Sequence, residues 1–314
     1  TINEGETAIT TISATDADGD SVTYNRTSDG DSSLFDITPT GELSFYTAPD
    51  YEDPGDSDSD NVYSVTVTAT DGFNTTEQVI SVTVSNINDT APAFVTEASF
   101  SAAENQTAVG TVLTTDADGD DLTFTISGSD ITITGSSSAE ENGNWPALLQ
   151  FVSAPDYETQ TSYSATITVS DGTNSTTQDI TVNVTNVNDL TPSFTSNTAY
   201  SAEENQTAIG TVTATDADGD SISFTISGSE INIDSSSGVM TFASAPNYET
   251  KSSYSATVTA SDGTNSATQD ITVNVTNVVE VAVVDDSSSG IEDDNIRVDV
   301  LANDTFNAGD VTLA

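Results

Sequence analysis

Acidic residues recur along this chain in a fixed order, and their carboxylates are the groups best able to do chemistry here. The string Asp-Ala-Asp-Gly-Asp begins at Asp16, Asp116 and Asp216, a spacing of 100 residues each time. A glutamate lies twelve residues before each copy, and Asp-Tyr-Glu or Asn-Tyr-Glu and then Asp-Gly follow it. Carboxylates gathered in this way either bind a cation or form a catalytic pair.

Catalysis is not expected. The 51 Asp and Glu residues could supply a carboxylate pair for glycoside hydrolysis. However, the same acids recur in every unit, whereas a catalytic site is normally asymmetric. The chain has no His and no Cys, which excludes Ser-His-Asp and Cys-His nucleophiles and zinc sites built from imidazole or thiolate. Lys251 is the only lysine and has no phosphate-binding loop around it. We therefore predict that the protein is not an enzyme.

Charge restricts the partners of this segment. Three Lys and Arg against 51 acids give a formal net charge of -48. Binding to nucleic acid or to an anionic membrane surface needs clustered basic residues, so neither is expected. No run of about 18 apolar residues occurs, so we expect no direct membrane insertion by this segment. Hydrophobic residues make up 34% of the chain in regular short runs, which predicts folded domains rather than disorder.

The elements that position the acids are predicted to be strands. Apolar residues alternate with Ser and Thr, as at Ile222, Phe224 and Ile226, which is typical of half-buried β-strands. About seven such runs occur in each unit of about 100 residues, the size of an immunoglobulin-like sandwich. The fold class is therefore all-β, with antiparallel sandwiches in tandem. The predicted domains are residues 1–90, 91–190, 191–280 and a truncated start of a further domain at 281–314.

Two units carry insertions, which we expect to be longer hairpin loops. The first unit has six extra residues, within 53–60, and the second has nine extra residues around 138–149. The second insertion holds Trp145, the only tryptophan. An exposed aromatic ring could stack on a sugar, but a tryptophan beside two leucines more often anchors its own loop, and we favour that role.

The placement of the acids indicates a metal ion. If the units follow one another end to end, the glutamates of one unit meet the Asn-rich junction and the Asp-x-Asp of the next unit. Gathered carboxylates repel, and with almost no Lys or Arg the adequate counter-charge is a metal cation. Carboxylate and Asn oxygens without nitrogen or sulfur ligands select Ca²⁺ rather than Zn²⁺.

These motifs, together with Asn-x-Asn-Asp-x-x-Pro-x-Phe at the first two junctions, resemble the calcium-binding motifs of cadherin repeats over residues 1–280. The resemblance implies sandwiches arranged end to end as a rod, with one cluster of ions at each junction. At the first junction it implies the ligands Glu4, Asp50, Glu52, Asn86, Asn88, Asp89, Asp116, Asp118 and Asp171. At the second it implies Glu104, Asp156, Glu158, Asn186, Asn188, Asp189, Asp216, Asp218 and Asp262.

The third junction departs from this pattern, because Asn247 replaces Asp and Val279-Glu280 replaces Asn-Asp. Glu204 and Glu249 could still hold an ion there, with Glu280 and Asp285 or Asp286. The final segment, through residues 300–305, resembles the opening of bacterial immunoglobulin-like repeats of long surface adhesins.

The resulting functional hypothesis is a calcium-stiffened stalk in a large extracellular, cell-surface adhesin of bacterial type. Its expected partners are calcium ions and the neighbouring repeats of the same chain. An alternative is a calcium-dependent module that recognises surface polysaccharide or another copy of itself. The alternation places chiefly Ser and Thr outside the strands, which favours the stalk.

Overall fold

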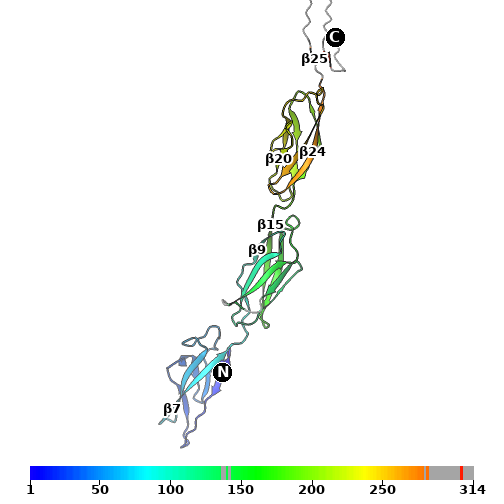
Figure 1. Cartoon of the computed structure of the whole chain (residues 1–314). Coiled ribbons are helices and arrows are strands. Elements are labelled where there is room, and N and C mark those ends of the chain that lie inside the picture. The colour runs from blue at the N-terminus through cyan, green and yellow to red at the C-terminus, as the bar shows by residue number, and fades with distance from the viewer. Residues whose placement is uncertain (136–138, 141–142, 279–280, 283–304, 307–314) are drawn as a thin grey trace, which may run out of the picture. The chain divides into compact units, whose positions relative to one another are not determined.

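The computed structural model describes the whole chain except residues 136–138, 141–142, 279–280, 283–304 and 307–314. The described part is all-β, as predicted, with three successive β-sandwiches (Figure 1) and one short 3-10 helix, η1. It contains no helix long and apolar enough to cross a membrane. The chain divides into two compact units, Thr1–Thr185 and Asn186–Ala314.

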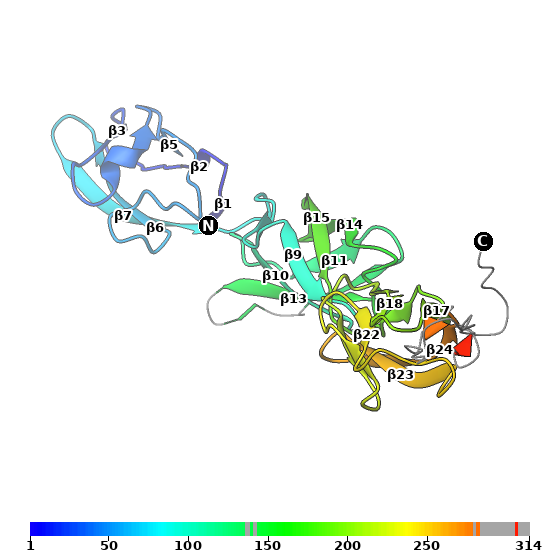
Figure 2. The same cartoon turned by 90° about the horizontal axis from the view of Figure 1, so that it is seen from above.

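The first sandwich consists of a four-stranded and a three-stranded sheet. The four-stranded sheet has the order β1-β7-β6-β3 and the other has the order β2-β5-β4. Figure 2 shows β6 and β7 on one side of this sandwich and β2 and β5 on the other. The elements are β1 (Ile2–Asn3), β2 (Ala8–Thr11), β3 (Thr23–Arg26), η1 (Ser32–Leu34), β4 (Phe35–Ile37), β5 (Glu42–Phe45), β6 (Val62–Thr70) and β7 (Thr75–Ser85).

The second sandwich completes the first unit and has two four-stranded sheets. Their orders are β12-β13-β10-β8 and β11-β14-β15-β9, and Figure 2 shows β9, β11, β14 and β15 on the opposite side from β10 and β13. The strands are β8 (Ala93–Phe94), β9 (Ser99–Ala103), β10 (Ala108–Thr115), β11 (Thr123–Ile126), β12 (Ile131–Gly135), β13 (Asn144–Phe151), β14 (Ser162–Ser170) and β15 (Ser175–Thr185).

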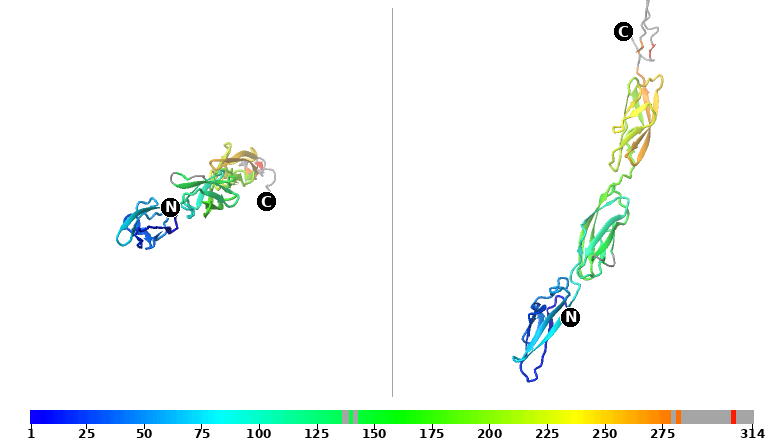
Figure 3. Two further views of the ribbon diagram at one scale, coloured as in Figure 1. Left: turned by 90° about the horizontal axis from the view of Figure 1, so that it is seen from below. Right: turned by 60° about the vertical axis from the view of Figure 1, so that its left-hand side comes forward.

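The third sandwich lies in the second unit and repeats this plan (yellow to orange in Figure 3). Its sheets have the orders β17-β24-β23-β20, β18-β22-β21 and β16-β19. The strands are β16 (Ser193–Phe194), β17 (Ala199–Glu203), β18 (Ala208–Thr211), β19 (Ala214–Thr215), β20 (Ser223–Ile226), β21 (Ile231–Ile233), β22 (Val239–Phe242), β23 (Ser253–Ser261) and β24 (Ser266–Thr276). Of the predicted domain at 281–314, only β25 (Val281–Ala282) and β26 (Thr305–Phe306) lie within the described residues, and they pair antiparallel.

Each sandwich adds one parallel pair to the expected antiparallel sheets, because its first and last strands run side by side. These pairs are β1 with β7, β9 with β15 and β17 with β24. In the second sandwich, β8 and β9 are halves of one first strand, which makes seven strands in all. In an alternating series of seven, the first and the last strand run in the same direction, so their pairing must be parallel.

Because the number of strands is odd, the chain enters the second sandwich at one end and leaves it at the other. β8 pairs with Thr114 and Thr115 at the end of β10, whereas the end of β9, at Ala103, pairs with Thr185. Asp116 follows β10 and therefore lies at the entry end. Glu104 follows β9 and lies at the exit end. The acids are thus placed at the two ends of the sandwich, away from the strand faces.

The alternating pattern produces the cores that were predicted from it. In β24, Ile271, Val273 and Val275 are buried while the residues between them are more exposed. One aromatic contact recurs in all three sandwiches, between a Phe and a Tyr with ring centroids about 5 Å apart in an edge-on arrangement. The pairs are Phe45–Tyr63, Phe151–Tyr163 and Phe242–Tyr254.

Trp145 packs inside the second sandwich, as favoured from the sequence, although its position differs from the expectation. It lies in strand β13 rather than in a hairpin loop, since the insertion lengthens β13 against β10. Its side chain is 3% exposed and packs with Leu122 and Val169. The buried hydroxyl of Thr114 donates a hydrogen bond to the Trp145 carbonyl over 3.2 Å. The ring therefore has no exposed face on which a sugar could stack.

We expect Trp145→Ala to destabilise the second sandwich by about 3 to 5 kcal/mol, because the truncation leaves a cavity in a packed core. Guanidinium unfolding followed by circular dichroism measures the loss. The matched control is Leu148→Ala on the same strand, where the side chain is 46% exposed. Equal stabilities of the two variants would contradict the packing role of Trp145.

Candidate metal centre

The first junction is built from loops at strand ends. Glu4 follows β1, and Glu52 lies in the segment between β5 and β6. Asp89 lies in the linker after β7, and Asp118 lies in the turn after β10 of the next sandwich. One carboxylate oxygen from each of these four residues lies within 4.8 Å of the other three. All four were predicted as ligands, and the structure brings them together within the first unit.

Glu4 holds three segments of the first unit in place. It is buried, at 3% exposed, and its Oε2 accepts a hydrogen bond from the backbone N–H of Tyr51 over 2.7 Å. Its Oε1 accepts one from the N–H of Ile87 in the linker, also over 2.7 Å. Both oxygens are thereby fixed in direction, which orients their remaining lone pairs before any ion binds.

Asp118 contacts the linker from the second sandwich. Its Oδ2 accepts hydrogen bonds from the N–H groups of Asp89, over 3.2 Å, and Thr90, over 2.9 Å. The Asn86 side-chain amide donates to the Asp118 carbonyl over 2.9 Å. Asp118 Oδ1 is buried and has no hydrogen-bond partner. One oxygen therefore accepts the hydrogen bonds that position the carboxylate, and the other is available to a cation.

Asp116 and Asp171 follow the same rule. Oδ1 of Asp116 accepts hydrogen bonds from the N–H groups of Gly119 and Asp120, over 3.0 and 3.1 Å. Oδ1 of Asp171 accepts two more, from Thr173 and Asn174, over 2.7 and 2.6 Å. The second oxygen of each aspartate is buried without a partner. A buried carboxylate oxygen without a donor is costly, which makes it a fit for a cation.

Burial and charge repulsion both shift the pKa of Glu52. Burial raises the pKa of Glu52 to about 7, and the nearby charges of Glu4 and Asp118 add to this rise. Burial also raises the pKa of Asp116. For Asp171, burial opposes ionisation, but the hydrogen bonds from Asn174 and Thr173 outweigh it and lower the pKa.

Basic residues do not relieve this repulsion. Within the described residues, the salt bridge is Lys251 with Glu230, over 2.6 Å, in the second unit. Arg26 lies over the ring of Tyr46, 5.7 Å from its centroid. Arg297, the remaining basic residue, lies outside the described residues. The carboxylates of the first junction therefore lack a protein counter-charge in the described part.

The predicted ligands Asp50 and Asn88 have other contacts. Asp50 lies outside the four-carboxylate group, and its Oδ1 accepts hydrogen bonds from the N–H groups of Glu52 and Asp53. It thereby shapes the loop that carries Glu52. Asn88 donates to the Asp171 carbonyl over 3.3 Å, and its Oδ1 accepts a hydrogen bond from the Asn174 side chain over 3.1 Å.

Two residues at the first junction, Asn174 and Asp120, were not among the predicted ligands. Asn174 was not predicted, although an Asn stands three residues after Asp71, Asp171 and Asp262 in the three repeats. Asp120 was not among the predicted ligands, because its place in the sequence fits either a metal ligand or an acid that shapes the turn. One of its oxygens lies within 4.8 Å of oxygens from Asp116 and Asp118, which favours the ligand.

The second unit repeats the linker contacts of the first. Asp218 Oδ2 accepts hydrogen bonds from the N–H groups of Asp189 and Leu190, over 3.1 and 2.8 Å. The Asn186 amide donates to the Asp218 carbonyl over 2.7 Å, and the Asn265 amide donates to Asn188 Oδ1 over 3.0 Å. The buried oxygens without a partner again belong to predicted ligands, which are Asp216, Asp218 and Asp262.

The other predicted ligands of the second junction, Glu104, Asp156 and Glu158, belong to the first unit. Glu104 is buried, and its Oε2 accepts a hydrogen bond from the N–H of Tyr157 over 2.8 Å, as Glu4 does from Tyr51. Asp156 Oδ1 accepts one from the N–H of Thr159 over 3.1 Å.

At the third junction, Glu204 keeps the geometry of Glu4. It accepts hydrogen bonds from the N–H groups of Tyr248 and Val278, both over 2.8 Å, and these lower its pKa. Glu249 accepts a hydrogen bond from the Asn277 side chain over 2.9 Å. The further candidates Glu280, Asp285 and Asp286 lie outside the described residues.

Known proteins share this architecture. Residues 88–185, which span the second sandwich, match the family model described as a bacterial Ig domain. A stretch of 199 residues is 30% identical to human Cadherin EGF LAG seven-pass G-type receptor 2, and covers 58% of this chain. The match spans only 7% of that receptor's length.

Solved structures agree in fold. The protocadherin gammaB7 EC3-6 cis-dimer structure matches with a TM-score of 0.64 and 22% identity, over 90% of this chain and 72% of that one. Mouse cadherin-23 EC22-24 matches with a TM-score of 0.61 and 21% identity, over 88% and 95%. The expected resemblances to cadherin repeats and to a bacterial Ig domain are both confirmed. The bacterial match falls on the second sandwich rather than on residues 281–314, where it was expected.

The raised pKa of Glu52 predicts a pH dependence in the calcium-free protein. The folded state holds the Glu52 proton more tightly than the unfolded state, in which the pKa is near the ordinary value of 4.5. This contribution to stability is therefore complete below that value and is lost as the pH rises through about 7. In chelator, we expect the wild type to lose stability relative to Glu52→Gln between about pH 5 and about pH 8.

Thermal unfolding of both proteins across this range measures the difference. Glu42→Gln is the control, because Glu42 is exposed and lies outside the carboxylate group. A constant difference between the wild type and Glu52→Gln at all pH values would show that Glu52 does not titrate in this way.

Proposed function

Since this chain is a series of tandem cadherin-like repeats, one of which also matches a bacterial Ig domain, we propose that it is a calcium-stiffened stalk of an extracellular cell-surface adhesin. In this role Ca²⁺ binds at the junctions between repeats and fixes each sandwich to the next. The chain itself supplies the ligands and the spacing.

The single observation that carries this proposal is the set of buried carboxylate oxygens without donors at the first junction. They belong to Glu52 of the first sandwich and to Asp116, Asp118 and Asp171 of the second. Each of the three aspartates uses its other oxygen to accept backbone N–H groups. Such oxygens are stabilised when a cation takes the place of the missing donor.

The donor set supports Ca²⁺ as the ion. It consists of carboxylate oxygens and, through Asn86 and Asn88, amide or backbone oxygens. Ca²⁺ takes six to eight oxygen ligands with flexible geometry, whereas Zn²⁺ prefers nitrogen and sulfur, and Mg²⁺ demands a near-ideal octahedron.

Repulsion explains why the ion would change the mechanics of the junction. Two unit charges at 4.8 Å, the largest separation within the carboxylate group, repel by roughly 3 kcal/mol at an effective dielectric constant of 20. Glu4 and Glu52 come from one sandwich, and Asp118 comes from the next. Without a cation, the two sandwiches are driven apart and the linker around Asp89 flexes. A bound cation attracts both sides and thereby links them.

For the second junction we propose the same role for Glu104, Asp156, Glu158, Asn186, Asn188, Asp189, Asp216, Asp218 and Asp262. The support is the repeated sequence and the matching hydrogen bonds within each unit. For the third junction, the proposal is limited to Glu204 and Glu249. The domain boundaries at 90, 190 and 280 are proposed with them.

Extracellular placement is proposed on the same grounds. Millimolar Ca²⁺ outside cells suits sites of moderate affinity in extracellular modules. The high negative charge keeps neighbouring stalks apart and soluble. The predicted partners are Ca²⁺ and the neighbouring repeats of the chain.

Calcium is expected to increase both the radius of gyration and the melting temperature of the chain, because it holds the junctions straight and stabilises the folded state by mass action. Small-angle scattering and thermal unfolding, with calcium and then with chelator, measure the two effects. Asp89→Ala should reduce both gains by removing one carboxylate of the first junction.

Two controls separate binding from charge. Asp121→Ala removes the same charge from an exposed position outside the carboxylate groups and should keep both gains. NaCl at equal ionic strength screens the repulsion without occupying a site. Equal effects of NaCl and calcium, or equal responses of the two variants, would contradict the proposal.

A further inference from the structure

The insertion of the first sandwich carries a second kind of acidic cluster. Asp56, Asp58 and Asp60 lie in the segment between β5 and β6, and one carboxylate oxygen from each lies within 4.8 Å of the other two. The corresponding segments of the other sandwiches are six residues shorter and have no such run. Of these three residues, none belongs to the four-carboxylate group of the junction.

Buried oxygens without donors mark this loop as well. Asp56 is 7% exposed, and its Oδ2 accepts a hydrogen bond from the Asp60 N–H over 2.9 Å, while its Oδ1 is buried with no partner. Asn61 is 9% exposed, and its Oδ1 is also buried with no partner.

Most other buried side-chain atoms without a hydrogen-bond partner belong to the predicted junction ligands. Ten buried side-chain atoms lack a hydrogen-bond partner in the described part of the chain, and seven of them belong to predicted junction ligands. Asp56 and Asn61 supply two of the other three, and Ser196 supplies the last. The loop thus shares with the junctions a feature that is rare elsewhere in the described structure.

The loop is held in shape by contacts outside the cluster. The Ser57 N–H donates to Asp31 Oδ1 over 2.9 Å, and Asp31 Oδ2 accepts from the N–H of Ser64 on β6 over 2.9 Å. The Asn61 amide donates to the Tyr51 carbonyl over 2.9 Å. Because these contacts fix the backbone in advance, little ordering would remain for an ion to impose.

The spacing of the acids fits a calcium-binding turn. Asp56, Asp58 and Asp60 occupy positions 1, 3 and 5, as in the first half of an EF-hand loop. Position 6, where that loop has an invariant glycine, is Asn61 with φ of 61°. The EF-hand glutamate of position 12 is replaced by Val67, a core residue. Backbone carbonyls and water would therefore complete the coordination.

We propose that Asp56, Asp58, Asp60 and Asn61 bind one Ca²⁺ within the first sandwich, separately from the junction ions. The neighbourhood supports a cationic ligand, since carboxylate oxygens of Asp56, Asp58 and Asp60 lie within 4.8 Å of one another and repel. The proposal does not depend on the proposed function, because every ligand comes from one loop of one sandwich.

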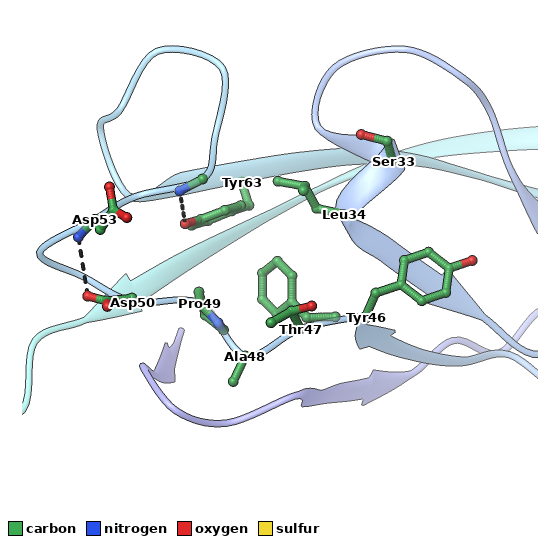
Figure 4. A pocket seen from close by; sticks show the side chains of 11 residues that line it. Ser33, Leu34, Tyr46, Thr47, Ala48, Pro49, Asp50, Asp53 and Tyr63 are labelled. Atoms are coloured by element: carbon green, nitrogen blue, oxygen red, sulfur yellow. Dashed lines mark hydrogen bonds between the residues drawn. The ribbon is translucent and has the colours of Figure 1, made fainter.

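The site would rigidify the edge of a cavity of about 360 Å³. Figure 4 shows Asp50, Asp53 and Tyr63 at one end of this cavity and Leu34 and Tyr46 at the other. The Gly55 N–H, one residue before Asp56, donates to the Tyr63 hydroxyl over 3.1 Å.

Hydrogen exchange of the full chain, read by mass spectrometry with calcium and with chelator, tests the proposal. At calcium 100 times the dissociation constant of the site, local opening of residues 55–62 should become about 100-fold rarer, because binding multiplies the stability constant by 1 + [L]/Kd. The double variant Asp58→Asn/Asp60→Asn should lose this protection. It should also bind one calcium ion fewer in equilibrium dialysis.

The matched control is Asp53→Asn/Glu42→Gln, which makes the same charge change at two exposed positions of the same sandwich and should behave as the wild type. In the same experiment, the exchange of peptides around residues 87–90 reports whether calcium protects the first junction. Protection there without protection at 55–62 overturns the loop site and leaves the stalk intact. Protection at 55–62 alone supports the loop site and counts against the junction mechanism. Equal ion counts in the two double variants also overturn the loop site.

Discussion

Carboxylates that are positioned by backbone N–H groups, yet left without a donor on their second oxygen, are the constraint on which this structure depends. Asp116, Asp118 and Asp171 all have this arrangement in the first unit, and Asp216, Asp218 and Asp262 repeat it in the second. The backbone hydrogen bonds secure the turns, whereas the free oxygens create a cost that the protein cannot relieve with three basic residues. In the proposed function a cation from solution relieves this cost, and the stability and rigidity of the junction would then depend on that cation.

The sandwich topology decides where that cost arises. With seven strands, the chain enters the second sandwich beside Thr115 and leaves it beside Thr185, at the opposite end. Turns at the entry end carry Asp116 and Asp171, and turns at the exit end carry Glu104. Strand faces between them stay nearly free of charge, as cross-strand repulsion requires. If the proposed function is correct, a repeat built in this way carries half of a binding site at each end, and tandem repetition completes the site.

Sequence periodicity predicted most of the fold, and the motifs that resemble those of cadherin repeats indicated most of the candidate site residues, because both depend on local patterns that recur along the chain. Neither could predict that Asp50 lies outside the carboxylate group of the first junction. Asp50 has the same residue type as Asp118, but its Oδ1 accepts hydrogen bonds within its own loop, and that choice depends on three-dimensional loop geometry. Trp145 was placed in a loop because an insertion looks alike in sequence whether it extends a loop or a strand. The parallel pairing of first and last strands likewise follows from the strand count and not from any one residue.

The first sandwich shows how the same chemistry can arise from a loop alone. At the junction, the carboxylates come from two sandwiches and a linker, so an ion there would link separate bodies. In the loop at 56–61, they come from six consecutive residues, and an ion there would stiffen only the loop. Asn61 connects the two, since its amide donates to the carbonyl of Tyr51, which lies between Asp50 and Glu52. Ordering of the loop would therefore restrict the motion of the backbone that carries Glu52. The insertion would in this way help to position a residue of the junction.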